Sequence, residues 1–201
     1  MSDERPAGPG LPRQPAPSGE PAPAGEPAPS EEPASAEEHV PGPGRSPQAA
    51  EKFVEPPREQ IPEISRAHVA ALESGLAEEF WVAAGMSHLI LRTLGRRSGH
   101  EHKVALPYWS DEDGSRIVVG SFAGAPQHPA WYLNLTDRER NAEVLVRVQA
   151  GAYWAEPELL DGEEYARVWA ALTTDRPFYI GYTKRTSRTI PLVRLRELRS
   201  A

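Results

Sequence analysis

The sequence predicts a mostly β fold with helices, in which five or six short, mainly antiparallel strands close into a compact barrel. Several short runs rich in β-branched residues stop at glycines, which is typical of buried strands. The valines at 144, 146 and 148 alternate strictly, as in a half-buried strand. A helical stripe over residues 165–172 indicates a helix that covers the barrel.

The first 54 residues are predicted to lie outside this fold. Residues 1–50 hold 13 of the chain's 22 prolines, and eight acidic side chains against three basic ones. Such a segment buries too little apolar surface to offset the entropy lost on ordering. We therefore expect a disordered, solubilising tail over residues 1–54 and a folded domain over residues 55–201.

The domain is expected to begin with a helix. Pro62 and Ser65 offer its start. Apolar residues follow at three- and four-residue spacing, namely Val69, Leu72, Leu76, Phe80 and Ala83. Gly75 weakens the helix and is a point where it could split, and Gly85 is expected to end it.

The strands are predicted in order along the rest of the chain. They cover residues 88–94, 103–110, 115–122, 144–148, 153–160 and 190–198. An acidic turn, Asp111 to Gly114, joins the second strand to the third. His128 and Pro129 start a short helix. A longer helix follows the fifth strand, with Asp161 and Glu164 at the spacing of a capping box and with Tyr165, Val168, Trp169 and Leu172 facing the core.

Composition excludes several classes of function. There is no cysteine, so disulfides and Cys-ligated metal sites are impossible. The net charge of -7 argues against general nucleic-acid binding. No apolar run approaches the length of a membrane span, so we expect a cytoplasmic protein, with peripheral membrane contact left open. His100 and His102 share a strand face, but no suitable carboxylate completes a site, and no metal is expected.

Three segments could carry chemistry. Residues 92–103 hold four fixed positive charges against one negative, and Gly95 and Gly99 permit tight turns around an anion; the alternative is a solvated basic surface. Residues 121–134 combine small residues with Trp131 and Tyr132, which could pack on a planar ring or belong to the core. Residues 176–188 place Tyr179 and Tyr182 in a loop, either as a mobile lid or as ordinary surface.

The motifs in these segments resemble a known family. The stretches LRTLGRRSGHEHKVALPYW, IVVGSFAGAPQHPAWYLNL and FYIGYTKRTSRTIPLVRL are similar, in order and spacing, to the deazaflavin-dependent nitroreductase family of actinobacteria. The resemblance runs from about Leu89 to Leu195. It implies a split β-barrel related to FMN-binding proteins, and the cofactor coenzyme F-420, a deazaflavin that carries a phosphate and an oligoglutamate tail.

The resemblance also implies roles for individual residues. The phosphate and tail would be contacted by Arg96, Arg97 and Ser98, and then by a strip of His102, Lys103, Val104, Ala105, Leu106 and Pro107. The deazaflavin ring would lie over Val119, Gly120, Ser121 and Phe122. Beside the ring would lie Ala130, Trp131, Tyr132, Leu133 and Asn134. The catalytic residues would be Tyr182, a lid residue near the reacting face, and its neighbour Tyr179.

Three positions depart from the family pattern. His102 stands where Arg is frequent, which would make cofactor affinity partly dependent on pH. Val104 and Ala105 replace a common Thr-Pro pair, and a hydroxyl that could reach the phosphate is lost. Leu133 stands where His or Tyr is usual, which leaves the acceptor open more than the cofactor.

The implied activity is hydride transfer from the reduced deazaflavin to a small electron-poor acceptor such as a quinone, nitroaromatic or enone. Two alternatives stay open: an FMN-dependent reductase on the same barrel, and a non-catalytic carrier of a flavin or deazaflavin. A homodimer is also left open.

Overall fold

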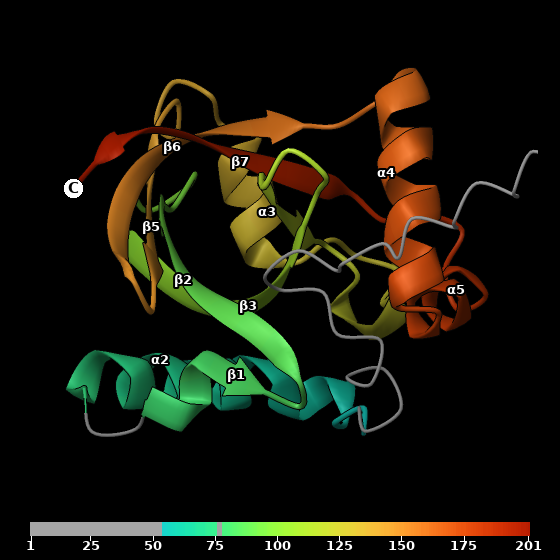
Figure 1. Cartoon of the computed structure of the whole chain (residues 1–201), viewed down its shortest axis with the longest axis horizontal. Helices are drawn as coiled ribbons and strands as arrows, with labels where there is room; N and C mark the ends of the chain where they lie inside the picture. The colour runs from blue at the N-terminus through green and yellow to red at the C-terminus, as the bar shows by residue number, and fades with distance from the viewer. Residues whose placement is uncertain (1–53, 76–77) are drawn as a thin grey trace, which may run out of the picture. The chain divides into compact units, whose positions relative to one another are not determined.

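A closed ring of six antiparallel strands forms the centre of the computed structural model, which describes residues 54–75 and 78–201 (Figure 1). The strands are β2 (Met86–Leu94), β3 (Glu101–Ser110), β4 (Arg116–Val119), β5 (Val144–Val148), β6 (Gly151–Leu159) and β7 (Leu192–Ser200). They follow the order β2-β3-β4-β7-β6-β5, and pairing of β5 with β2 closes the ring. A two-residue strand that was not predicted, β1 (Val82–Ala83), pairs with β2. The predicted barrel is confirmed.

Helices cover the outside of the barrel and close one of its ends. They are α2 (Ile61–Ser74), α3 (Ala130–Leu135), α4 (Gly162–Asp175) and α5 (Phe178–Thr183), with 3-10 turns η1 (Arg58–Gln60), η2 (Glu78–Trp81) and η3 (Phe122–Gly124). In Figure 1, α2 lies across β2 and β3, whereas α4 and α5 lie together on another side. None of the helices among the described residues is long and apolar enough to cross a membrane.

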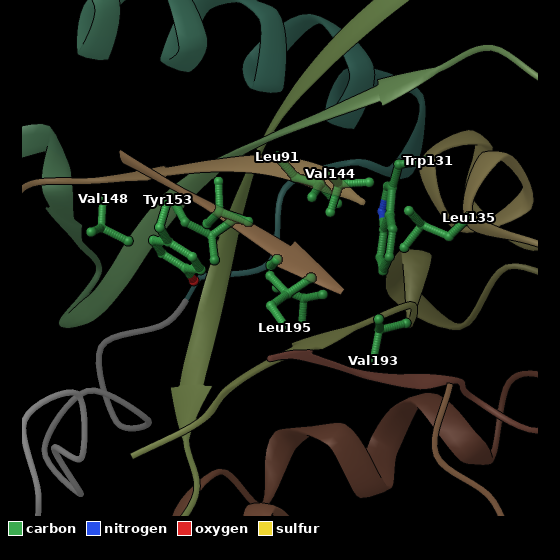
Figure 2. Packing of buried hydrophobic residues seen from close by; sticks show 12 residues of the cluster. Leu91, Trp131, Leu135, Val144, Val148, Tyr153, Val193 and Leu195 are labelled. Atoms are coloured by element: carbon green, nitrogen blue, oxygen red, sulfur yellow. The ribbon is translucent and has the colours of Figure 1, made fainter. Parts of the chain in front are cut away.

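The largest hydrophobic cluster fills the barrel. Alternation along β2 turns Leu89 and Leu91 inward, and Ile90 outward against α2. Figure 2 shows Trp131 and Leu135, both from α3, at one end of the inner cluster and Tyr153 toward the other. A second cluster lies under α4 and α5, where the predicted stripe of α4 packs as expected.

The first helix is shorter than predicted. It ends at Ser74 because Gly75 adopts a left-handed conformation with φ 67°, the usual glycine C-cap. Phe80 and Ala83, which were expected to continue the helix, lie instead in η2 and β1. Leu76 lies outside the described residues, as does the predicted tail apart from Val54.

The capping box of α4 is also a wrong prediction. Asp161 makes no side-chain cap hydrogen bond, and Glu164 is instead engaged by Arg167 and Arg194. Both arginines also bind Asp111, with Nη2 of Arg167 at 2.6 Å and Nη2 of Arg194 at 3.1 Å from Oδ2. Attraction to two guanidinium groups therefore outweighs the local cap, and it ties α4 to β7 and to the acidic turn.

Candidate functional site

The basic turn, residues 92–103, spans the connection from β2 to β3, and the Ser98 and His102 side chains pack closely over Gly95. Its backbone is closed by bonds from Gly95 N to His100 O (2.8 Å) and from Gly99 N to Gly95 O (2.7 Å). A Cβ at Gly95 would lie 2.5 Å from the Ser98 hydroxyl and 2.7 Å from Nε2 of His102. The turn therefore folds tightly onto itself, and Ser98 and His102 are exposed on it.

The cations of this turn differ in their partners. Arg92 is paired with Glu101, and the Lys103 ammonium lies 2.7 Å from Glu73 of α2. No carboxylate of the described residues lies within ion-pair distance of Arg96 or Arg97. Arg96 and Arg97 are therefore the cations of the turn that are most available to a bound anion.

Asn134 joins the basic turn to α3. Its Oδ1 accepts from the backbone N–H of Arg96 (3.3 Å) and from the Arg96 guanidinium (3.4 Å). Its Nδ2 donates to the Thr93 hydroxyl at 3.1 Å, and its side chain is 5% exposed. Two segments that the family resemblance assigns to the same ligand, the basic turn and α3, are thus held together by one buried amide.

Asn141 completes this junction and was not singled out from the sequence. Its Oδ1 accepts from Leu94 N at 2.7 Å, and its Nδ2 donates to Leu94 O (3.0 Å) and to Asn134 O (2.9 Å). It is 1% exposed. The Asn141 side chain thus bonds to both backbone groups of Leu94, the last residue of β2, where a neighbouring strand would otherwise bond. Because this contact joins residues far apart along the chain, it leaves no local pattern in the sequence.

The predicted contact strip on β3 is divided between two faces. Val104 and Leu106 pack on the cluster inside the barrel. Ala105 packs under α2, and its backbone N–H and C=O both bond to the Ser65 hydroxyl, at 3.1 and 3.3 Å. Pro107 pairs with His88 of β2. The side chain and backbone of Ala105 both contact α2, and its predicted contact with the cofactor tail stays a prediction.

The loop after β4 has an unusual backbone. Phe122, Ala123 and Gly124 are all left-handed, with φ of 46°, 51° and 71°. Gly120 is pressed against Pro191, whose Cγ would lie 2.5 Å from an added Cβ. The N–H groups of Phe122 and Ala123 meet no acceptor within the part of the chain that the structure describes. Ala123 is only 5% exposed and packs in the cluster under α4 and α5, whereas Phe122 is half-buried and lines a surface pocket, so the Phe122 N–H is the more accessible of the two donors.

The short helix α3 begins after Pro129, as predicted. Trp131 is 8% exposed and belongs to the barrel core, which is the second of the two interpretations given for it. Tyr132 remains half-buried, with its ring centroid 4.9 Å from that of His128. Burial, followed by the charge of Arg188, lowers the pKa of His128. Ala130 is exposed and Leu133 half-buried, so α3 presents a mixed surface beside the loop.

A wide, open cavity of about 740 Å³ lies at the surface beside the loop after β4. It is lined by Phe122, Gln127 and Arg185, and by residues 55–59 with Pro62. The Glu55 carboxylate bonds to the Arg185 guanidinium at 2.5 Å. Gln127 and Arg185 lie in two of the segments singled out from the sequence, residues 121–134 and 176–188, although neither was given a role. Residues 55–59 and Pro62 were not expected at the site, because nothing in the sequence indicates that the start of the domain returns to residue 185.

Tyr179 and Tyr182 lie on α5, so the expectation of a loop is wrong here. They are 3% and 4% exposed, and burial of their rings stabilises this short helix. The Arg185 guanidinium lies 5.3 Å from the centre of the Tyr182 ring, which places Tyr182 directly behind the cavity wall. Burial, followed by the nearby Glu55 charge, raises the pKa of Tyr182, so its phenol keeps its proton at neutral pH.

Comparison with known proteins supports the family resemblance. The family model described as F420H(2)-dependent quinone reductase matches residues 64–197. This chain belongs to that family. Two F420H(2)-dependent quinone reductases from strains of Mycobacterium tuberculosis are each 32% identical to it over 106 residues, which cover 52% of this chain and 70% of the relative. A solved structure of an F420-H2 dependent reductase is 29% identical, with a TM-score of 0.46, and covers 54% of this chain and 92% of that chain.

The match to the quinone reductase family includes the basic turn, the loop after β4, α3 and α5. It does not include residues 54–63, which contribute one wall of the cavity. The cavity of this family member is thus completed by a segment outside the part that the family model describes.

Proposed function

We propose that this chain binds reduced coenzyme F-420 and transfers hydride from it to a quinone-like acceptor. The observation that carries the proposal is the Asn134 junction, which holds the basic turn beside α3 and so supports one continuous site for an anionic tail and a ring. Membership of the quinone reductase family supports the cofactor and the class of acceptor.

The residues of the chain fit the two ends of such a cofactor. At the tail end, Arg96 and Arg97 would bind phosphate and glutamate oxygens, with Ser98, His102 and Lys103 beside them. Lys103 contributes less than its charge suggests, because Glu73 shares it. At the ring end, the backbone N–H of Phe122 has no acceptor among the described residues and could donate to a ring carbonyl.

The remaining predicted contacts surround these two anchors. Val104, Leu106 and Pro107 would continue the tail strip along β3. Val119, Gly120, Ser121 and Phe122 would lie beneath the ring, with Ala130, Tyr132, Leu133 and Asn134 beside it. Trp131 would act through packing, because it is buried in the barrel.

The protein's own contribution is orientation and charge stabilisation, since the bound cofactor supplies the hydride. The acceptor would lie in the cavity beside Phe122, with Gln127 and Arg185 in contact with it. Tyr182 lies behind Arg185, so a shift of the Arg185 side chain would bring its hydroxyl within reach of the acceptor oxygen, where it would donate a hydrogen bond as negative charge grows. Residues 55–59 would help to exclude water from the cavity.

Titration of the purified protein with coenzyme F-420, FMN, FAD and NADPH tests the cofactor. We expect F-420 to bind at micromolar concentration or below, and FMN more weakly, because FMN has no oligoglutamate tail for the basic turn. Tighter or equal binding of FMN would contradict this and favour the FMN-dependent alternative. Turnover of a quinone by reduced F-420 then separates an enzyme from a carrier.

A further inference from the structure

The three left-handed residues after β4, Phe122 to Gly124, must be stabilised by contacts with groups outside the turn. Phe122 and Ala123 carry a Cβ, and consecutive left-handed residues of this kind are disfavoured because Cβ approaches the following carbonyl oxygen. Two bonds close the turn internally, from Gly124 N to Ser121 O (3.0 Å) and from Ala125 N to Phe122 O (2.9 Å). A strained backbone persists only where its surroundings fix it.

Arg188 makes most of these stabilising contacts. Its Nε donates to Ala125 O at 2.9 Å, and its Nη2 donates to Gly120 O at 3.0 Å and to Ser121 O at 2.7 Å. These carbonyls lie on both sides of the left-handed turn. A planar guanidinium can reach them together, whereas an ammonium group on a single stem cannot reproduce the fork.

The same contacts decide which backbone groups of the loop stay free. Arg188 occupies the carbonyls of Gly120, Ser121 and Ala125, and the Arg58 guanidinium lies 3.4 Å from Ala123 O. The N–H groups of Phe122 and Ala123 remain without an acceptor among the described residues, and Phe122 lines the cavity. The Arg188 guanidinium thus binds the loop through its carbonyl groups and leaves the Phe122 N–H unoccupied.

We propose that Arg188 is the positioning residue of the reductase site. It fixes residues 122–124 in their left-handed conformation, and so keeps Phe122 in the cavity wall with its backbone N–H available to the ring of the cofactor. This inference rests on the proposed function for its consequence, although the stabilisation of the turn by Arg188 is a property of the protein without cofactor.

The stabilisation of the turn by Arg188 is tested by hydrogen exchange on cofactor-free protein carrying Arg188→Gln or Arg188→Lys. We expect the Gly124 and Ala125 amides to exchange roughly 10-fold faster or more in Arg188→Gln, and by a smaller factor in Arg188→Lys. The amides of Ile117 and Val168 should keep the parent rate. Arg196→Gln removes an exposed guanidinium that does not contact the loop, and it should match the parent throughout.

Fluorescence titration with F-420 tests the consequence. We expect roughly 10- to 100-fold weaker binding in Arg188→Gln, with partial recovery in the double variant Arg188→Gln/Ala123→Gly, because glycine accepts the left-handed conformation without strain. Exchange at Gly124 and Ala125 that stays at the parent rate, or that accelerates equally in β4 and α4, would overturn the positioning role. Local loosening in a protein whose parent form does not bind F-420 would uphold that role and contradict the proposed function instead.

Discussion

Tyr182 offers a test of the site at the level of one hydroxyl. Replacing Tyr182 by Phe keeps the ring that packs in the α5 cluster and removes only the donor. We expect kcat/KM for quinones to fall roughly 10- to 1000-fold, which corresponds to about 1.4–4 kcal/mol of lost transition-state stabilisation. Steady-state kinetics with reduced F-420 measure this, and the affinity for F-420 should change little.

Tyr179→Phe is the matched control on the same helix. The Tyr179 hydroxyl interacts with Arg176, so its removal should lower the thermal midpoint more than it lowers turnover. If Tyr182→Phe reduces quinones at the parent rate, Tyr182 contributes packing alone and the donor role fails.

The burial of His88 lets us predict how the free energy of unfolding depends on pH. It is 9% exposed, and burial, followed by the neighbouring His68, lowers its pKa to about 4 from 6.5. The unfolded chain takes up a proton below pH 6.5 that the folded protein refuses until about pH 4. The free energy of unfolding should therefore fall by about 3 kcal/mol as the pH drops through this window, and stay constant with respect to His88 above it.

Urea denaturation between pH 4 and 7 measures this contribution. His88→Asn keeps a donor for the carbonyl of Met86, which His88 Nδ1 contacts at 2.8 Å, and it has no group that titrates in the window. The decline below pH 6.5 should be shallower in His88→Asn than in the parent, and unchanged in the exposed control His100→Asn. Equal slopes in His88→Asn and the parent would show that other groups dominate.

At the level of elements, Asn134 should couple the basic turn to α3. Asn134→Ala leaves the buried Thr93 hydroxyl without its amide donor, and we expect it to lower the free energy of unfolding by about 1–3 kcal/mol. It should also weaken F-420 binding, because Arg96 loses its anchor. Thr136→Ala, at the exposed end of the same helix, should leave both denaturation and titration unchanged. Normal affinity of Asn134→Ala for F-420 would show that the contacts of Asn134 do not contribute to cofactor binding.

The elements that the sequence predicted well are those whose signal is local and repeated. Val144, Val146 and Val148 alternate because β5 has one buried face, and α4 follows its apolar stripe. Where a single glycine decided the outcome, as at Gly75, the sequence allowed both a split and a continued helix. The helix α5 was missed because its glycine and tyrosines resemble a loop, and only packing against distant core residues makes the segment helical.

The charged residues of the candidate site could be predicted from the sequence, whereas the hydrogen bonds that join its segments could not. Arg96 and Arg97 stand out in an acidic chain, and the family motif supplied the residues that are proposed to surround the ring. The contacts of Asn141, Arg188 and Glu55 join segments far apart along the chain, and hydrogen bonds of that kind follow from the barrel topology rather than from local spacing. The same topology moved Ala105 to the face under α2.

At the level of the whole molecule, the tail of residues 1–50 should be dispensable. Its composition gives it little apolar surface to bury, so removing it should leave the thermal midpoint and the turnover of a quinone close to those of the full chain. Calorimetry and steady-state kinetics on both proteins measure this. A deletion ending at residue 50 keeps Glu55 and its contact with Arg185. A large loss of stability or rate would show that the tail binds to the domain.

The pairing of β2 with β5, which closes the barrel, also limits the order in which the strands can form during folding. β2 and β3 are neighbours in sequence and can form a hairpin early, as can β5 and β6. The contact of β2 with β5 brings together residues such as Ile90 and Arg147, and it must wait for a long loop to close. We therefore expect refolding in milliseconds to seconds, with the unjoined edges of β2 and β5 exposed to intermolecular pairing until the ring is complete.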